Sequence, residues 1–221
     1  MSFSDEDELV RGMRRLAERD LLVEILKDHK ERLEALVPAL FGKETIPIEC
    51  FLDIGILTAF VTIDLLGYFC EGESTSASAV SFMRKYMGQI DPRYAEASGL
   101  LYHCIRHGWV HRSRPERLKL ERGKLIRFLF SNDPSREGHL SLKRYADGNL
   151  HLVISLPLVY QDLKSAIDLY LRDIEQNGAL LETSRKVLLE MREPEEEQTL
   201  RGRKYFLNSD IEFLVRQLPK E

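Results

Sequence analysis

The stretch of residues 50–70 is the longest apolar run in the chain, and it restricts the fold more than any other feature. A membrane helix of this length would need a core nearly free of charged side chains, but Asp53 and Asp64 interrupt this run and two threonines dilute it. The run therefore predicts a helix from about Ile48 to Phe69 that is buried inside a bundle of helices and does not span a membrane.

The spacing of apolar residues is helical in the first half of the chain. Before Gly42, leucines recur at intervals near three and four, which predicts an amphipathic helix or a pair of helices. Further helices are expected over residues 78–87 and after Asp91 and Pro92, which are typical of a helix cap and a first helical turn. The first half is therefore expected to be a helical bundle.

After Pro115 the pattern changes to an alternation typical of strands. Asp147–Gly148 lies between two such runs and favours a tight turn, because this pair tolerates positive φ. A small antiparallel sheet is thus predicted, followed by one helix opened by Pro157 and another from about Leu180 to Met191. The order of helices, strands and helices predicts an α+β protein and not a parallel sheet built from βαβ units.

This order predicts four parts of the chain. They are a helical bundle over residues 1–114, a small antiparallel sheet over 115–156, a helical hairpin over 157–192 that packs on the bundle or the sheet, and an acidic linker with a short C-terminal helix over 193–221. The sheet is therefore expected as an insertion before the C-terminal helices.

Positive charge is concentrated in one segment of the chain. The formal net charge is −4 over 221 residues, so the molecule as a whole is not a nucleic-acid-binding polycation. Between Arg106 and Arg127, however, eight Lys or Arg residues stand against two Glu. The eight are Arg106, Arg112, Arg114, Arg117, Lys119, Arg122, Lys124 and Arg127. This segment is the candidate for contact with an anionic partner.

The cysteines and the N-terminal residues bear on the compartment. Cys50, Cys70 and Cys104 are odd in number and widely spaced, without a CxxC pair, which argues against a disulfide framework or a zinc knuckle. Residues 1–8 are acidic and lack the basic and apolar pattern of a signal peptide. We therefore expect a cytoplasmic protein with reduced thiols and no membrane partner.

Residues 103–111 hold three of the six histidines and the only tryptophan of the chain. Because side chains four positions apart share one face of a helix, His103, His107 and His111 would form a polar stripe with Arg106 if the helix continued to His111. Gly108 is expected to end or bend that helix.

Three interpretations of this segment stay open on the residues alone. In the first, the histidines are partly exposed and Arg106 and His111 pair with acids elsewhere. In the second, His103, His107 and His111 bind a metal, although helical zinc sites place a glutamate beside the histidines and none lies here. In the third, a histidine takes the proton from a ribose 2′-hydroxyl of RNA, and an arginine stabilises the negative charge that builds on phosphorus.

The segment from Leu100 to His111, after an apolar and helical first half, resembles the HEPN superfamily (higher eukaryotes and prokaryotes nucleotide-binding). The signature of that family is Arg-x4–6-His with a polar residue directly after the arginine. The resemblance covers Ile48 to Arg114 and implies a bundle of four or five helices that dimerises so that two motifs face each other. Many members are metal-independent endoribonucleases of defence and toxin–antitoxin systems, whereas others are inactive and serve as binding or scaffold domains.

The resemblance implies a role for each residue of the motif. Arg106 would stabilise the charge on phosphate, His111 would be the general base or acid, and His107 would orient the substrate or the catalytic groups. The expected RNA-binding residues are Arg112, Arg114, Arg117 and Lys119. The predicted function is a homodimeric endoribonuclease that uses no metal or cofactor, with an antitoxin or accessory protein as a partner. The alternative is a non-catalytic HEPN-like module that binds RNA, a nucleotide or a protein.

Two features depart from the family pattern. Ser113 stands where one subclass has a tyrosine that is modified by nucleotide transfer, and the strands predicted within 118–154 are absent from the minimal bundle. Asp64 is either a partner of Arg106, since a buried carboxylate needs one, or an exposed residue at the edge of its helix.

The sequence also predicts where three further side chains lie. Trp109 is expected in the core and not stacked on a base. His139 and His151 lie on predicted strands and have no recognisable constellation around them.

Overall fold

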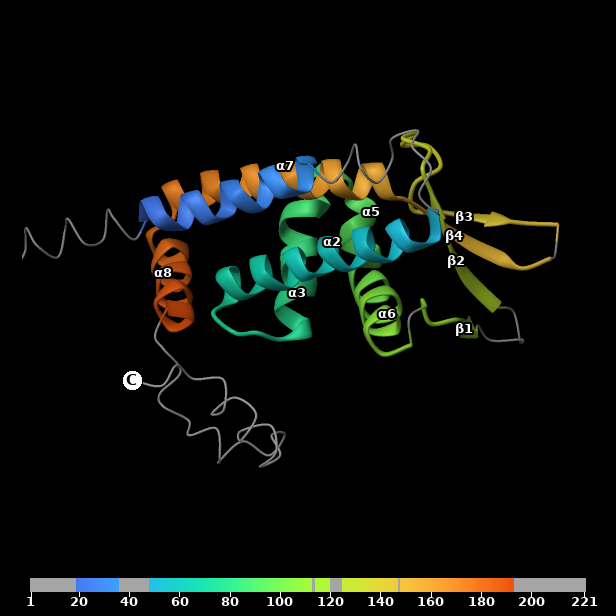
Figure 1. Cartoon of the computed structure of the whole chain (residues 1–221), viewed down its shortest axis with the longest axis horizontal. Helices are drawn as coiled ribbons and strands as arrows, with labels where there is room; N and C mark the ends of the chain where they lie inside the picture. Colours follow the sequence, from blue (N-terminus) through green and yellow to red (C-terminus); the bar gives the residue numbers. More distant parts are fainter. Residues whose placement is uncertain (1–18, 36–47, 113, 120–124, 147, 193–221) are drawn as a thin grey trace, which may run out of the picture.

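Helices make up most of the structure, and a small sheet lies at one end of it (Figure 1). The computed structural model describes residues 19–35, 48–112, 114–119, 125–146 and 148–192. The predicted α+β class is confirmed. The predicted acidic linker and final helix, over residues 193–221, lie outside the described residues.

Residues 19–35 form the first described helix. The later helices are α2 (Ile48–Glu71), α3 (Ser76–Phe82), α4 (Gly88–Ile90), α5 (Pro92–Leu101), α6 (Gly108–Arg112), α7 (Leu156–Gln176) and α8 (Gly178–Arg192). Two π-helical segments, η1 (Met83–Met87) and η2 (Tyr102–His107), join α3 to α4 and α5 to α6. The strands are β1 (Leu118–Lys119), β2 (Leu125–Ser131), β3 (Ser141–Arg144) and β4 (Leu150–Ser155). The long helix predicted from about Ile48 is thus confirmed as α2.

The helix of residues 19–35 lies along α7, at the top of Figure 1. Lys30 contacts Asp168 at 2.6 Å, and Glu34 contacts Lys164 at 2.6 Å. From Lys30 to Glu34 the residue number rises in the first helix, while the partner on α7 falls from 168 to 164, so the two helices run antiparallel. These ion pairs border the contact, while Leu22, Leu26 and Leu33 bury its apolar side.

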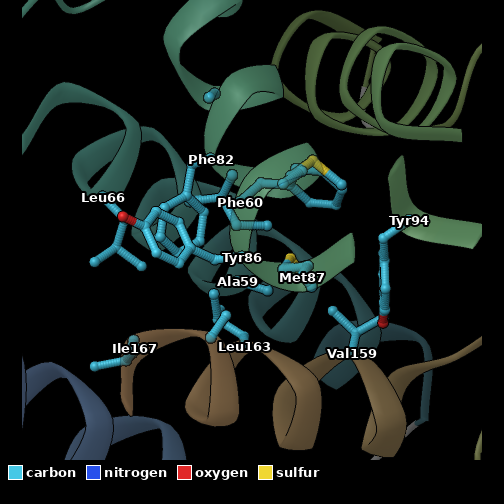
Figure 2. Close-up of a cluster of buried hydrophobic side chains, with 14 of the residues drawn as sticks. Ala59, Phe60, Leu66, Phe82, Tyr86, Met87, Tyr94, Val159, Leu163 and Ile167 are labelled. Atoms are coloured by element: carbon cyan, nitrogen blue, oxygen red, sulfur yellow. The ribbon is translucent and has the colours of Figure 1, made fainter. Parts of the chain in front are cut away.

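The core lies between α7 and the helices α2 and α3. Figure 2 shows Leu163 and Ile167 of α7 in the same buried cluster as Phe82 and Tyr86, and all four side chains are at most 1% exposed. Burying side chains of this size contributes about 1.5–3 kcal/mol each. The hydroxyl of Tyr160 donates a hydrogen bond to the Gly55 carbonyl at 2.6 Å, which ties the start of α7 to α2.

α3 crosses α2 at a close approach that depends on Gly67. A Cβ atom at this position would lie 2.6 Å from the Ala79 backbone nitrogen, which no side chain tolerates. The connection between the two helices then turns at Gly72, whose φ of +76° is in the left-handed region that favours glycine. Thr75 caps α3 by accepting a hydrogen bond from the Ser78 amide at 3.2 Å. This connection is thereby fixed beside α2.

The sheet is mixed, so the predicted antiparallel sheet is wrong in one pairing. The strand order is β1-β2-β4-β3, in which β1–β2 and β3–β4 are antiparallel but β2 and β4 are parallel. The physical reason is burial: β4 carries the buried residues 152–155 and takes a central position, whereas β3 is largely exposed and forms an edge. Residues 132–140 are long enough to carry the chain from β2 to that edge. The predicted turn is confirmed at Gly148, whose φ is +75°, while Asp147 lies outside the described residues.

In the part of the chain that the structure describes, no helix by itself is long and apolar enough to cross a membrane. The stretches Gly55–Glu71 and Ser76–Ile90 pass such a test of length and composition only as a pair, and they are bent by 91°.

Candidate functional site

An open pocket of about 380 Å³ lies where the connection after α2 faces the η2 segment. Its lining residues are Asp64, Ser74, Thr75, Ser76, Tyr102, His103, Arg106 and His107. It therefore brings together the arginine of the motif, two of its histidines and a wall of hydroxyl groups. Two of the three predicted catalytic residues, Arg106 and His107, line it.

Asp64 of α2 is the partner of Arg106, as one of the two sequence interpretations held. The Arg106 Nε donates a hydrogen bond to Asp64 Oδ2 at 3.1 Å, and Arg106 Nη2 lies 3.1 Å from the same oxygen. The other carboxylate oxygen, Oδ1, accepts a hydrogen bond from the Tyr102 hydroxyl at 2.6 Å. The side chains of Asp64 and Arg106 are 25% and 31% exposed, so this ion pair borders the pocket and is not sealed in the core.

Tyr102 stabilises both members of the ion pair. Its ring lies beneath the guanidinium of Arg106, with the central carbon 5.8 Å from the ring centroid, within the range of a cation–π contact. Burial, and then the hydrogen bond to Asp64, raise the pKa of Tyr102 to about 12. The phenol therefore keeps its proton at neutral pH and donates it to the carboxylate.

The ion pair occupies only one side of the guanidinium. Of the five N–H donors of an arginine, those of Nε and one of Nη2 face Asp64. The terminal edge, formed by Nη1 and the outer N–H of Nη2, has no protein acceptor among the described residues. This is the edge that binds the two oxygens of a phosphate or carboxylate.

The three histidines of the motif are all exposed, and two of them are in contact. The ring centroids of His107 and His111 lie 4.3 Å apart, whereas His103 contacts Tyr102 at 5.7 Å. His111 is outside the pocket lining, and its ring contacts that of His107, which lines the pocket. Among the described residues, no group of three or more His, Cys, Asp or Glu side chains is placed to hold a metal ion, so the predicted alternative of a three-histidine metal site is not formed.

Gly108 was expected to end or bend the helix that carries the motif, but the helix does not end there, because α6 follows η2 directly and Gly108 has helical φ and ψ of −59° and −45°. Gly108 is needed for a different reason, since a Cβ atom would lie 2.7 Å from both the Arg114 carbonyl oxygen and the Glu116 amide nitrogen of the returning chain. The Glu116 amide donates a hydrogen bond to the Cys104 carbonyl at 2.8 Å. Because a π-helical turn leaves some carbonyl groups outside the regular helix ladder, the Cys104 carbonyl of η2 is able to accept this bond. The bond holds the returning chain against the helical turn that carries Arg106 and His107.

The predicted RNA-binding residues follow this helix. Arg114, Arg117 and Lys119 are exposed in the segment that leads into β1. Arg112 is the last residue of α6, and its side chain lies outside the described part of the structure. Trp109 is 9% exposed and packs edge to face on Phe130 with centroids 5.1 Å apart, so the prediction that it is a core residue is confirmed.

Tyr102 and the hydroxyl wall were missed by sequence reasoning. Tyr102 lies four residues before Arg106, a spacing that places both on one helix face, and this signal was sufficient to find it. Ser74 and Ser76 reach the pocket through the crossing of α2 and α3, which no local sequence pattern indicates.

A second polar cluster, also missed, surrounds His139 at the junction of the sheet with α5 and α7. The Ser155 amide donates to His139 Nδ1 at 3.0 Å, and His139 Nε2 lies 2.9 Å from the Tyr94 hydroxyl. Burial, and then the nearby charge of Arg93, lower the pKa of His139 to about 4. The imidazole, which is 0% exposed, is therefore neutral, with its proton on Nε2.

Ion pairs complete this second cluster. Arg136 donates through Nη1 and Nη2 to the two oxygens of Asp162 at 2.6 and 2.7 Å, and Asp162 is 1% exposed. Arg93 donates to Asp91 and to the His139 carbonyl. Hydrogen bonding from Arg93 lowers the pKa of Asp91 to about 2 despite its burial. The cluster joins the sheet to α5 and α7. Because its central residues are buried, it offers no access to a substrate.

Comparisons of the chain with protein-family models, with curated proteins and with solved structures found no significant match. The resemblance to the HEPN superfamily therefore rests on the sequence motif alone.

Proposed function

We propose that the pocket beside Arg106 binds RNA and cleaves its phosphodiester bonds without a metal ion, as a HEPN-like endoribonuclease. The observation that carries this proposal is the terminal edge of the Arg106 guanidinium, which is left for an anionic ligand in an open pocket next to exposed imidazoles. A guanidinium in this position would stabilise the negative charge that develops on phosphorus in the transition state.

The neighbouring imidazoles support the proton transfers that such a reaction needs. One imidazole of the His107–His111 pair would take the proton of the ribose 2′-hydroxyl while the 2′-oxygen attacks phosphorus. The 5′-oxygen of the next nucleotide would leave and receive a proton from the other ring, which acts as an imidazolium and becomes a neutral imidazole. The products would be a 2′,3′-cyclic phosphate and a 5′-hydroxyl end. Exposed Arg114, Arg117 and Lys119 would hold backbone phosphates without reading sequence.

Exposed apolar side chains on α2 and α6, the helices next to the motif in the chain or in contact with it, support the homodimer that the resemblance implies. Val61 lies three residues before Asp64 on α2 and is 59% exposed, and Val110 lies four residues after Arg106 and is 48% exposed. A partner copy that covers both would bring two pockets close together. The oligomeric state, measured by sedimentation, tests this part: Val61→Asp should shift a dimer to a monomer, and a wild-type monomer would contradict it. The toxin or defence role and its protein partner stay predictions.

The function is tested by incubating mixed RNA with the purified chain in the presence of a chelator. The Arg106→Ala, His111→Ala double variant should cleave at least about 100-fold more slowly than the wild type. Arg32→Ala is the matched control, because Arg32 is an exposed arginine paired with Asp28 on the helix of residues 19–35. A single 2′-deoxy substitution at the cleaved position should block the reaction. Equal cleavage by the wild type and the double variant, or none under any condition, would refute catalysis.

The ion pair between Arg106 and Asp64 favours a second candidate function, which is RNA binding without cleavage. A carboxylate 3.1 Å from the guanidinium offsets part of its charge and weakens the stabilisation it can give to a pentacovalent phosphorus. This candidate predicts salt-dependent binding of RNA with no turnover, as measured by fluorescence anisotropy between about 50 and 200 mM salt.

A further inference from the structure

Arg106 is held by contacts that come from two different helices. Asp64 lies on α2, 42 positions earlier in the chain, and both donors on one side of the guanidinium face its Oδ2 atom at 3.1 Å. An unpaired arginine side chain rotates about several bonds, and fixing it in one orientation has an entropic cost. Because Asp64 already orders Arg106 in the folded protein, a ligand that binds does not have to order it.

Asp64 is held in turn by Tyr102. The Tyr102 hydroxyl donates to Oδ1 at 2.6 Å, which orients the carboxylate plane so that Oδ2 faces Arg106. Tyr102 is 6% exposed, and its ring packs edge to face on Phe60 with centroids 6.5 Å apart. The chain of contacts therefore runs from the buried core through a phenol and a carboxylate to the guanidinium that borders the pocket.

We propose that Asp64, oriented by Tyr102, is the positioning residue of this site and holds the terminal edge of Arg106 toward the phosphate that is to be cleaved. This inference rests on the proposed function of the pocket. A group fixed in this way stabilises the transition state more than the bound substrate. Misplacing a charged donor by about 1 Å therefore lowers the rate of cleavage more than it lowers the affinity for RNA. Loss of Asp64 should therefore lower kcat while KM stays nearly unchanged.

The opposite reading of the same contact is that Asp64 restrains Arg106 and must release it. The two readings predict opposite changes. If Asp64 were a restraint, its removal would raise activity; since it positions Arg106, its removal lowers activity, and an asparagine that still offers an oxygen to Nε restores part of it.

The fold provides a matched control for this experiment. Asp173 of α7 accepts a hydrogen bond from the Tyr86 hydroxyl at 2.9 Å and contacts Lys85 at 3.0 Å, so it has the same tyrosine–carboxylate–cation arrangement outside the pocket lining. Asp173→Ala and Tyr86→Phe reproduce the loss of a carboxylate or a hydroxyl, with its effect on stability, without touching Arg106.

The test measures kcat and KM for RNA cleavage by the full chain in chelator. Asp64→Ala should lower kcat about 30- to 100-fold with KM within about threefold, and Tyr102→Phe should lower kcat about three- to tenfold. Asp64→Asn should recover about tenfold of the loss, while Asp173→Ala stays within about twofold of the wild type. A kcat for Asp64→Ala equal to that of Asp173→Ala, any increase in activity, or a loss confined to KM would overturn the positioning role and leave the proposed function standing.

A binding measurement separates this inference from the failure of cleavage. With 2′-O-methyl RNA, which cannot be cleaved, both Asp64→Asn and Asp64→Ala remove one negative charge, so an effect of charge alone predicts equal affinities. Positioning predicts that the asparagine variant binds about two- to threefold more tightly than the alanine variant, a small difference that agrees with a KM within about threefold of the wild type. If the wild type binds but does not cleave, equal affinities of the two variants overturn the positioning role. If it neither binds nor cleaves, the proposed function and this inference are both overturned.

Discussion

The buried imidazole of His139 should make the stability of the protein depend on pH. Its Nδ1 atom accepts a hydrogen bond from the Ser155 amide, so a proton added there would place two N–H donors against each other. Burial and the positive charges of Arg93 and Arg136 oppose that proton as well, and only Asp91 favours it. The pKa of His139 is therefore lowered from 6.5 to about 4.

The sign and size of the effect follow from this shift. Between about pH 6.5 and 4, His139 is protonated in the unfolded chain but stays neutral in the folded chain. The free energy of unfolding is therefore unaffected by this group above about pH 6.5 and decreases as the pH falls toward 4. At about 1.36 kcal/mol per pKa unit, the loss is about 1.4 kcal/mol at pH 5.5 and about 2.6 kcal/mol at pH 4.5. Asp91, with a pKa lowered to about 2, becomes important only below its ordinary value of 3.8.

Urea unfolding at several pH values between 7.5 and 4.5 measures this loss, with His139→Gln as the control. The variant should be less stable at pH 7.5 by about 1–3 kcal/mol, because the buried Ser155 amide loses its acceptor. Its stability should then fall less steeply, so that the stability of the wild type relative to the variant decreases by about 2.6 kcal/mol between pH 7.5 and 4.5. Parallel curves for the two proteins over this range would refute the reasoning.

Three further predictions concern the motif helix, the buried ion pair and the basic segment. Gly108→Ala should destabilise the protein by about 1–3 kcal/mol in urea unfolding, because its Cβ meets the Arg114 backbone. The control is Gly99→Ala, which has open space around it and should be stabilising by up to about 1 kcal/mol. Equal effects of the two substitutions would contradict the role given to the close approach at Gly108. Arg136→Ala should cost about 2–3 kcal/mol, less than a fully buried pair because Arg136 is 40% exposed, and a cost below about 0.5 kcal/mol in the same assay would show that Asp162 needs no partner. Arg117→Ala should reduce the slope of log affinity against log salt for single-stranded RNA by about 0.7, and an unchanged slope in anisotropy titrations would remove this residue from the RNA path.

Much of the fold was predictable because it is encoded locally. The apolar run of α2, the capped start of α5 at Asp91 and Pro92, and the turn at Gly148 each depend on neighbours within a few positions. The parallel pairing of β2 with β4 does not, since it joins strands that are far apart in the sequence, and the more buried strand, β4, lies between β2 and β3. Alternation shows that a strand exists, but it carries no information on which strand lies beside it.

The candidate site divides along the same line. Arg106 and His107 were found because the motif is continuous in sequence, and Asp64 could be suggested because a carboxylate in an apolar helix needs a partner. The environment of His139 could not be predicted, because Tyr94 and Ser155 are 45 and 16 positions away from it. The interruption of the helix ladder at η2 was also not predictable, since it depends on the Glu116 amide that returns to the Cys104 carbonyl.

The arginine–aspartate pairs at Arg106 and Arg136 use different edges of the guanidinium, and this difference separates their roles. The terminal edge of Arg136 donates to both oxygens of the buried Asp162. No part of that edge is left for a ligand, and the pair stabilises the fold. Arg106 meets Asp64 with its side edge, on a single oxygen, and keeps the terminal edge at an open pocket. Replacing either arginine with lysine, which lacks the planar fork, should therefore act on different properties: on the free energy of unfolding at position 136, and on RNA binding or cleavage at position 106.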